Sequence, residues 1–389
     1  MEAGSVCGDR PLRLLACLLA LWTSRLPAFD QAPFDVAANK VLLTVAPTPE
    51  NPRNSEGAFA TLGSGRIIFC YSSYYGGKGE DHGPARIAQI HSDDQGLTWS
   101  APRTIVENEG RCNVMSVSLL RAASGKLHMV YLVKNSWVDC RPYLRTSEDD
   151  GATWSAPRLI LQAPGYFVAN NDRLIQTSKG RLILPLAFHR SRGQDPLSSR
   201  SFDARAIALW ITSDDDGKTW QEAANWWAMP VRSGSGLQEP GVVERADGLL
   251  FSWARTDAGF QYGFESKDGG KSWEAPAPTT LASPVSPASI KRIPGSAELL
   301  AIYNDHSGRF AFPKGRRSPL VAAISTDGGA TWGRHKLLEG DPDGWYCYTA
   351  IHFVGDDVLL AYCAGDSAKK TYLNVMRLRK TSLAWLRSE

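Results

Sequence analysis

An eight-residue motif that occurs five times restricts the possible folds of this chain more than any other feature. The motif reads Ser-x-Asp-x-Gly-x-Thr/Ser-Trp, and its copies span residues 92–99, 147–154, 213–220, 266–273 and 325–332. Successive copies begin roughly 53 to 66 residues apart, which is longer than an ankyrin or helical repeat and suits a unit of four β-strands. The chain is therefore predicted to be an array of small sheets.

The residue types of the motif predict a turn. Ser and Asp side chains cap nearby backbone N–H groups, Gly adopts the positive φ that a tight turn needs, and Trp fills a gap between neighbouring sheets. Acidic strings such as Asp214-Asp215-Asp216-Gly217 also resemble calcium loops. None of them has the bidentate Glu at the twelfth position of an EF-hand loop. The motifs, called Asp-box turns below, are thus interpreted as structural, and catalytic residues are expected elsewhere.

Composition agrees with one all-β domain. Gly (35 residues) and Pro (23 residues) recur at turn-like intervals among the 389 residues, between short β-rich runs such as 66–71 and 127–132. The content of 43% hydrophobic residues is sufficient for one large core. A net charge of +3 without a Lys/Arg block gives no support to a nucleic-acid partner.

The number of repeats predicts six blades. After the fifth motif, residues 348–364 and the alternating run 372–378 supply strands for one more sheet that lacks the motif. Residues 36–45 are predicted to add a strand to this last sheet and so close the ring, which removes exposed edges. We therefore expect residues 29–389 to form a six-bladed β-propeller whose loops converge on one axis.

The N-terminus has the pattern of a secretory signal. Arg10 and Arg13 precede the apolar run 14–22, and Ala28 offers a small residue for cleavage. The run is too short to span a bilayer. Residues 1–28 are therefore predicted to be a signal peptide, and the protein to be secreted or lumenal without stable membrane insertion. A lipobox at 14–17 and an extension without a targeting role are the alternatives.

The cysteines predict neither a disulfide framework nor a zinc motif. The five beyond residue 28 form an odd set without paired spacing: Cys70, Cys112, Cys140, Cys347 and Cys363. Cys70 and Cys363 stand in apolar runs and are expected to be buried thiols.

Ionisable residues near the ends of predicted strands carry a second pattern. Its members are Arg53, Asp81, Glu239, Arg255, Arg317 and Tyr348. Together with the five Asp-box turns, they resemble the sialidase (neuraminidase) superfamily, whose fold is a six-bladed propeller. The likeness covers nearly the whole chain beyond the signal.

This resemblance implies a role for each residue. Arg53, Arg255 and Arg317 would bind the substrate carboxylate, because Arg stays protonated and offers a planar fork. Tyr348 would be the nucleophile with Glu239 as its base, since a carboxylate nucleophile would meet the negative charge on the anomeric carbon. Asp81 would act as acid and then base. Arg316 and Tyr346 are neighbours that could be confused with Arg317 and Tyr348.

The implied function is that of a retaining exo-glycosidase that releases terminal sialic acid, or a related nonulosonic acid, from glycoconjugates. Its expected partners are sialylated or other acidic glycans, and its chemistry requires no cofactor and no metal. Two alternatives stay open. One is a propeller that binds glycans or proteins without catalysis, and the other is a glycosidase for a different acidic sugar.

The sequence also departs from the family pattern. Sialidases usually follow the first Arg with a hydrophobic residue and Pro, whereas Arg53 is followed by Asn54-Ser55-Glu56. Glu56 would bring an acidic group near a site for an anion unless it faces a hydroxyl or amine or pairs with an Arg. Residues 135–141 together with Asn171 and Asp172 are candidates for contacts to sugar hydroxyls, although turn chemistry explains the Asn-Asp pair equally well.

Overall fold

The computed structural model describes residues 38–193 and 195–389. The predicted signal peptide at residues 1–28 lies outside this range. Within it, the chain is built almost entirely from β-strands, with a single turn of 3-10 helix (Ser199–Ser201) and one short α-helix, α1 (Leu383–Arg387). No helix described in this range has the length and apolar character to cross a membrane. The prediction of an all-β domain is confirmed.

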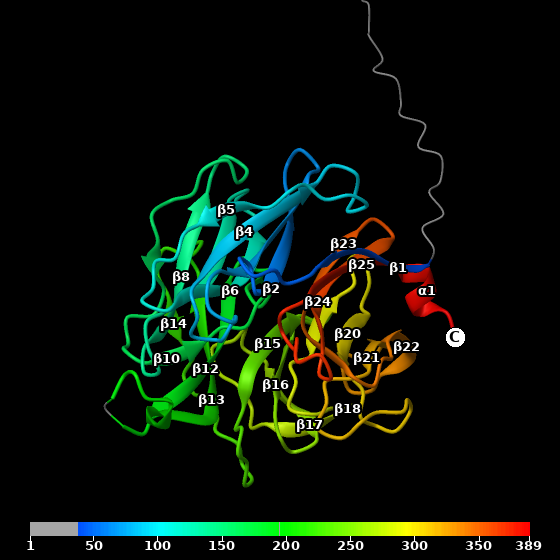
Figure 1. Cartoon of the computed structure of the whole chain (residues 1–389). Helices are drawn as coiled ribbons and strands as arrows, with labels where there is room; N and C mark the ends of the chain where they lie inside the picture. The colour runs from blue at the N-terminus through cyan, green and yellow to red at the C-terminus, as the bar shows by residue number, and fades with distance from the viewer. Residues whose placement is uncertain (1–37, 194) are drawn as a thin grey trace, which may run out of the picture. The chain divides into compact units, whose positions relative to one another are not determined.

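The strands form five sheets that follow one another along the chain, as the colours of Figure 1 show. The first sheet contains β2 (Arg53–Thr61), β3 (Ile67–Tyr74), β4 (Ala85–Ser92) and β5 (Arg103–Val106). The second has nine strands: β6 (Asn113–Arg121), β7 (Leu127–Lys134), β8 (Cys140–Ser147), β9 (Arg158–Leu159), β10 (Tyr166–Val168), β11 (Ile175–Gln176), β12 (Leu182–Ser191), β13 (Phe202–Ser213) and β14 (Gln221–Glu222).

The remaining three sheets have four strands each. The third contains β15 (Gln238–Glu244), β16 (Leu250–Arg255), β17 (Phe260–Ser266) and β18 (Ala277–Ala282). The fourth contains β19 (Ser289–Arg292), β20 (Leu299–Asn304), β21 (Leu320–Ser325) and β22 (Gly333–Glu339). The fifth contains β1 (Asn39–Val45), β25 (Met376–Ser382), β24 (Asp357–Asp366) and β23 (Gly344–Val354), in that order.

The N-terminal strand completes the last sheet. β1 pairs antiparallel with β25, and Asn39 lies opposite Thr381, so that the blue and red ends of the described chain run side by side in Figure 1. This confirms a strand within the predicted span 36–45, from Asn39 onward, and its pairing with the last sheet; residues 36 and 37 lie outside the described residues. The alternating run 372–378 becomes a strand only from Met376. The residues before it form a turn, in which the backbone N–H of Thr371 donates to the carbonyl of Asp366 over 2.9 Å.

Apolar clusters lie between the sheets. Alternate side chains of a strand point to opposite faces, and β7 uses both: its odd-numbered residues from Leu127 to Val133 pack with β2 and β3, whereas Val130 and Leu132 pack with β12 and β13. β20 and β24 divide their two faces between different clusters in the same way. The sheets are therefore stacked face to face, which explains why strands such as β7 are buried along their whole length.

Each Asp-box turn joins two strands that follow one another in the chain and pair antiparallel, for example β4 with β5 and β21 with β22. In the first copy the hydroxyl of Ser92 accepts the backbone N–H of Gly96 at 2.8 Å. The Asp94 carboxylate accepts the backbone N–H of Thr98 at 2.9 Å and its hydroxyl at 2.6 Å. The corresponding bonds recur in the other four copies. The motif thus holds its own turn.

The cysteines beyond residue 28 are free thiols. Cys70 and Cys363 are both fully buried, as predicted from their apolar runs.

Candidate functional site

Four backbone bulges direct side chains into one cavity. Glu56 on β2, Ser116 on β6, Glu239 on β15 and Tyr348 on β23 all have positive φ angles, between 48° and 59°. Each lies where the pairing of its strand with the next shifts register. A bulge re-aims a side chain, and a left-handed non-glycine residue costs on the order of 1–3 kcal/mol. The same strained device on four strands is typical of a functional site.

The cavity has a volume of about 200 Å³. Carboxyl, basic, aromatic and amide groups mix on its wall, which includes Glu56, Asp81, His82, Ser116, Lys134, Trp137, Tyr166, His189, Phe202, Gln238, Glu239, Arg255 and Tyr348. The sequence-predicted residues Glu56, Asp81, Glu239, Arg255 and Tyr348 are therefore brought together, although they come from three different sheets.

Tyr348, Glu239 and Arg255 form a bonded group. The Tyr348 hydroxyl donates to Oε1 of Glu239 over 3.2 Å, and Nη1 of Arg255 lies 3.4 Å from the same hydroxyl and 3.1 Å from Oε2 of Glu239. Burial, together with the charge of Glu239, raises the pKa of Tyr348 well above its ordinary value. The phenol is therefore protonated at neutral pH, and its hydroxyl is hydrogen-bonded to the Glu239 carboxylate.

Arg53 lies behind the cavity wall and joins two carboxyl groups. It is only 2% exposed, and its two Nη atoms lie 2.5 Å from Oδ1 of Asp81 and 3.3 Å from Oε1 of Glu56. Of the partners expected for Glu56, namely a hydroxyl, an amine or an Arg, the structure shows an Arg, because Glu56 pairs with Arg53. Burial raises the pKa of Glu56 to about 7, against the opposing charge of Arg53. Burial also opposes ionisation of Asp81, but Arg53 and Lys134 outweigh it and hold the pKa of Asp81 well below its ordinary value.

Arg317 contacts the aromatic ring of Tyr348 and not its hydroxyl. Its Cζ lies 5.4 Å from the centroid of the Tyr348 ring and 5.6 Å from that of Trp345. Of the three predicted arginines, Arg255 lines the cavity, whereas Arg53 and Arg317 contact residues that line it.

The two neighbours with similar side chains have other partners. Tyr346 packs in the apolar cluster between β20, β21 and β24. Arg316 lies 3.6 Å from Asp343 and outside the cavity wall. The structure therefore favours Tyr348 over Tyr346 and Arg317 over Arg316 as members of the site.

Asn171 and Asp172 do not reach the cavity, so the structure does not support their predicted contacts with sugar hydroxyls. Nδ2 of Asn171 donates to the carbonyls of Gly57 and Tyr348 at 2.8 and 3.1 Å. Asp172 pairs with Lys291 at 2.8 Å and accepts the backbone N–H of Ile351 at 3.0 Å. These bonds hold strands together, because the buried carbonyl and N–H groups there need partners.

Several wall residues were not predicted. Nζ of Lys134 donates to the backbone carbonyl of Asp81 over 2.8 Å, and the ring of His82 stacks on Trp137 with centroids 3.7 Å apart. Trp137 lies in the segment 135–141, which the sequence indicates as a candidate for sugar contacts, so Lys134 and His82 are the unpredicted residues of this group. Burial and the charge of Lys134 lower the pKa of His82 to about 4, so its ring is neutral at physiological pH. Aromatic rings and a neutral imidazole suit contacts with a sugar.

No cluster of three or more His, Cys, Asp or Glu side chains suited to a metal ion occurs among residues 38–193 and 195–389.

Comparison with known proteins relates this geometry to a family. Residues 65–360 match the family of BNR repeat-like domains. A sialidase of Bacteroides fragilis (strain YCH46) is 29% identical over 225 residues, which are 54% of this chain and 37% of that protein. The match thus covers little more than a third of the relative's own length.

Two solved structures share the fold. A Hadza microbial sialidase superimposes with a TM-score of 0.67 at 19% identity, over 86% of this chain and 66% of that one. The intramolecular trans-sialidase of Ruminococcus gnavus, in complex with oseltamivir carboxylate, superimposes with a TM-score of 0.69 at 14% identity, over 92% of this chain and 100% of that one. At these identities the likeness shows a common fold.

Proposed function

This chain belongs to the BNR repeat-like domain family within the sialidase superfamily, and from this premise we propose that it is a retaining exo-glycosidase that releases terminal sialic acid, or a related nonulosonic acid, from glycoconjugates. The observation that carries the proposal is the hydrogen bond of 3.2 Å between the Tyr348 hydroxyl and Glu239 in a cavity that also holds Asp81. A binding protein would have no need for a buried phenol paired with a base.

In the first proposed step the phenolic oxygen of Tyr348 attacks the anomeric carbon while Glu239 accepts the phenolic proton. The glycosidic C–O bond breaks, and Asp81 in its acid form donates a proton to the leaving oxygen. In the second step Asp81 takes a proton from water, whose oxygen attacks the anomeric carbon. The bond to Tyr348 breaks, and Glu239 returns the proton to the phenolate. Two inversions at one carbon give net retention.

The carboxylate of the substrate would be held by arginines. Arg255 and Arg317 both contact Tyr348, so an acid group on the attacked carbon would lie within their reach. Arg53 is occupied by Glu56 and Asp81 in the free protein. We propose that the substrate carboxylate draws Arg53 away from Asp81, because loss of that partner would raise the pKa of Asp81 and so allow it to hold the proton that it must donate.

Support for a six-bladed propeller comes from the apolar clusters. The nine-stranded sheet is continuous only through β8 and β10, which share one parallel residue pair, Tyr166 with Cys140. One apolar cluster lies across that junction, with β7 and β8 on one side and β12 and β13 on the other. We therefore propose that this sheet represents two blades, so that residues 29–389 form six.

A glycosidase for a different acidic sugar is the second candidate, and Glu56 is the observation that favours it. With a pKa of about 7, this carboxyl group can donate a hydrogen bond to a ligand hydroxyl when protonated and bind an amine when ionised. Hydrolysis of a panel of uronides and nonulosonic acid glycosides would distinguish the two candidates.

The decisive test is hydrolysis of a fluorogenic sialoside by the purified protein. Turnover with retention of configuration, monitored by NMR of the first-formed anomer, would support the proposal. No turnover of any acidic glycoside, together with intact ligand binding, would instead establish a non-catalytic propeller.

We also propose that the protein is secreted, on the basis of the signal pattern at residues 1–28. N-terminal sequencing of protein recovered from the medium tests this, and a start at or near residue 29 is expected.

A further inference from the structure

A hollow larger than the catalytic cavity lies directly beside it. Its volume is about 750 Å³, within the range of roughly 300–1,000 Å³ found for small-ligand sites. Phe202 lines both hollows. The next residue, Asp203, faces the larger one, and its carbonyl lies 2.9 Å from Nδ1 of His189 on the cavity wall. The start of β13 is thus a wall that the two hollows share.

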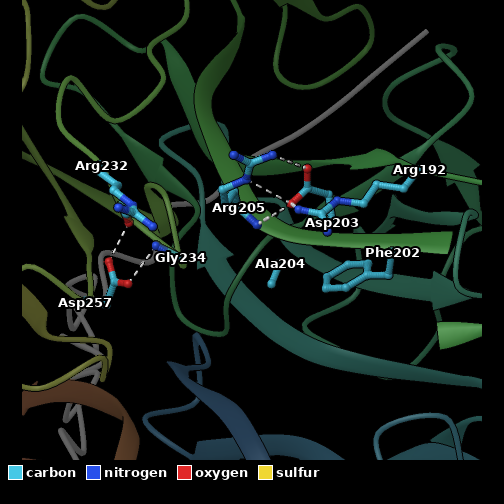
Figure 2. Close-up of a pocket in the computed structure, with 9 residues that line it drawn as sticks. Arg192, Phe202, Asp203, Ala204, Arg205, Arg232, Gly234 and Asp257 are labelled. Atoms are coloured by element: carbon cyan, nitrogen blue, oxygen red, sulfur yellow. Dashed lines mark hydrogen bonds and ion pairs between the residues drawn. The ribbon is translucent and has the colours of Figure 1, made fainter. Parts of the chain in front are cut away.

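Three arginines converge on Asp203: Arg192 and Arg205 line this hollow, and Arg190 lines an adjoining one. Figure 2 shows Arg192 and Arg205 bonded to the Asp203 carboxylate. Nη2 atoms of Arg190, Arg192 and Arg205 lie 3.3, 2.9 and 3.1 Å from its oxygens. Asp203 is only 2% exposed, whereas the three arginine side chains are between 51% and 63% exposed. One buried carboxylate can neutralise one guanidinium, so positive charge remains at the mouth.

A second group adds to this charge. Arg232 also lines the hollow and forms no ion pair among the residues that the structure describes. Asp257 lies on the same side of the hollow as Arg232 in Figure 2. Its carboxylate accepts hydrogen bonds from the hydroxyls of Ser233 and Ser235 and from the backbone N–H of Gly234. Arg192, Arg205 and Arg232 therefore line this hollow beside two carboxylates that already have partners. With Arg190, which also pairs with Asp203, the group has a formal excess of about two positive charges.

The geometry of the guanidinium groups favours an anion over a purely structural role. Each guanidinium has five N–H donors, yet Arg190 and Arg192 each use one of them on Asp203. The buried carboxylate therefore fixes the position of these forks and leaves most donors directed to solvent. Such preorganised forks match a carboxylate or a sulfate ester.

The neighbouring surface indicates a ligand with a carbohydrate character rather than a lone ion. Arg205 and Arg232 also line an adjoining hollow of about 320 Å³, whose wall further includes Arg190, Met229 and Val231. Val231 is 52% exposed. A sugar chain has apolar C–H faces that pack on such side chains and polar edges that bind guanidinium groups. Three linked hollows thus suit an oligosaccharide.

We propose that the hollow lined by Arg192, Arg205 and Arg232 binds a second acidic group of the substrate, carried by the sugar chain from which the terminal acid is released. The ligand is an oligosaccharide with a carboxylate or a sulfate ester beyond its scissile bond. This inference rests on the proposed function, because the terminal sugar of that ligand occupies the cavity.

The test compares kcat/KM for three sialosides: one with a neutral lactose aglycone, one with a second sialic acid as aglycone, and one with a sulfated galactose. The wild type should prefer at least one acidic substrate by about tenfold or more. R192A/R205A should lose that preference and keep its kcat/KM on the neutral sialoside. A preference confined to one acidic substrate identifies carboxylate or sulfate as the ligand group. Equal rates on all three, or a preference that survives in R192A/R205A, would overturn the proposal.

Two further variants distinguish loss of the arginine site from a folding defect in R192A/R205A. R232A removes an exposed guanidinium without an ion pair and should lower the preference in the same direction. R192K/R205K keeps the charge but not the forks, and an intermediate preference is expected. R66A is the matched control, since Arg66 is an exposed arginine paired with Asp93 and lines neither hollow; it should behave as the wild type.

Calorimetric binding separates this proposal from the proposed function. The probe is the free sulfated or sialylated disaccharide, titrated into the wild type and R192A/R205A at two salt concentrations. Binding by the wild type that weakens with salt and is lost in the double variant supports the arginine site even if no sialoside is hydrolysed, in which case only the proposed function fails. Hydrolysis of the neutral sialoside without any binding of the acidic disaccharides would overturn the arginine site alone.

Discussion

The hydroxyl of Tyr348 and the carboxylate of Glu239, 3.2 Å apart, each project from a left-handed bulge on an edge strand of a different sheet, with φ angles of 59° and 48°. A bulge re-aims the side chain that it carries, so both side chains leave the regular alternation of their strands. The two strained positions thus contribute the two partners of one hydrogen bond.

Removing the Tyr348 hydroxyl should abolish turnover and spare binding. Y348F deletes the proposed nucleophile, so kcat should fall by about 10³-fold or more while the affinity for a carboxylate-bearing inhibitor changes little. The measurement is steady-state hydrolysis of a fluorogenic sialoside alongside calorimetric titration of the inhibitor. Y346F is the matched control, since Tyr346 is packed in an apolar cluster, and it should remain active. An active Y348F enzyme would eliminate the nucleophile assignment.

Two adjacent arginines, Arg316 and Arg317, offer a test of the proposed binding of the substrate carboxylate by Arg317. Arg317 stacks on Tyr348 at 5.4 Å, whereas Arg316 pairs with Asp343 at 3.6 Å. R317A should raise KM for sialosides by about tenfold or more, because a charge-assisted bond to the substrate carboxylate is lost. R316A, which removes the same charge one residue away, should leave KM within about twofold. Equal effects of the two substitutions would show that only overall charge matters.

The Asp-box turns could be predicted from sequence because every bond that defines them is local. Ser92, for example, bonds the N–H of a residue four positions away, so the information lies within one short segment. The turn before Met376 was missed because the alternation of residues 372–378 is the same in a strand and in this turn. Burial of β7 on both faces follows from packing against β2 and β3 on one side and β12 and β13 on the other. These partners are distant in the sequence, so no local pattern predicts the burial.

The site was predictable only in part, for a related reason. Glu239 and Tyr348 were found through resemblance to a family, whereas Ser116 and Lys134 belong to no motif and reach the cavity through the arrangement of the sheets. Asn171 was assigned to sugar binding because hydrogen-bonding residues at a blade end have the same signature whether they bind a ligand or a backbone. Its actual partners are carbonyls of residues far away in the sequence.

Asn171 should therefore support both stability and catalysis. N171A leaves the carbonyls of Gly57 and Tyr348 without this partner, so the free energy of unfolding should fall by about 2 kcal/mol and kcat should fall through misplacement of Tyr348. N225A is the matched control, because Asn225 also bonds two backbone groups, the N–H and the carbonyl of Trp273, away from the cavity. It should lose comparable stability with unchanged kcat. Urea denaturation and steady-state kinetics of both variants provide the comparison.

Glu56 should make stability depend on pH near neutrality. Its pKa in the folded protein, about 7, is above the value of 4.5 that an unperturbed Glu has. The stability associated with its protonated form is therefore fully present below about pH 4.5 and is lost as pH rises through about 7, with a total of about 3 kcal/mol at ~1.4 kcal/mol per pH unit. E56Q should remove this loss, so that the variant becomes more stable relative to wild type between pH 5 and 8. Parallel pH profiles of the free energy of unfolding would contradict this assignment.

Two neighbouring carboxylates in the third Asp-box turn, Asp214 and Asp215, allow the effect of hydrogen bonds within the turn to be distinguished from the effect of negative charge alone. Asp215 accepts the backbone N–H and the hydroxyl of Thr219 at 2.8 and 2.6 Å and the hydroxyl of Ser213 at 2.8 Å, whereas Asp214 forms an exposed pair with Arg181. D215A should lower the free energy of unfolding by about 2 kcal/mol, since three bonds worth roughly 1 kcal/mol each are lost and water replaces some of them. D214A, which removes the same charge, should lower it by less than about 1 kcal/mol. Chemical denaturation at pH 7 measures both, and a loss in D214A as large as in D215A would mean that charge rather than turn geometry stabilises the motif.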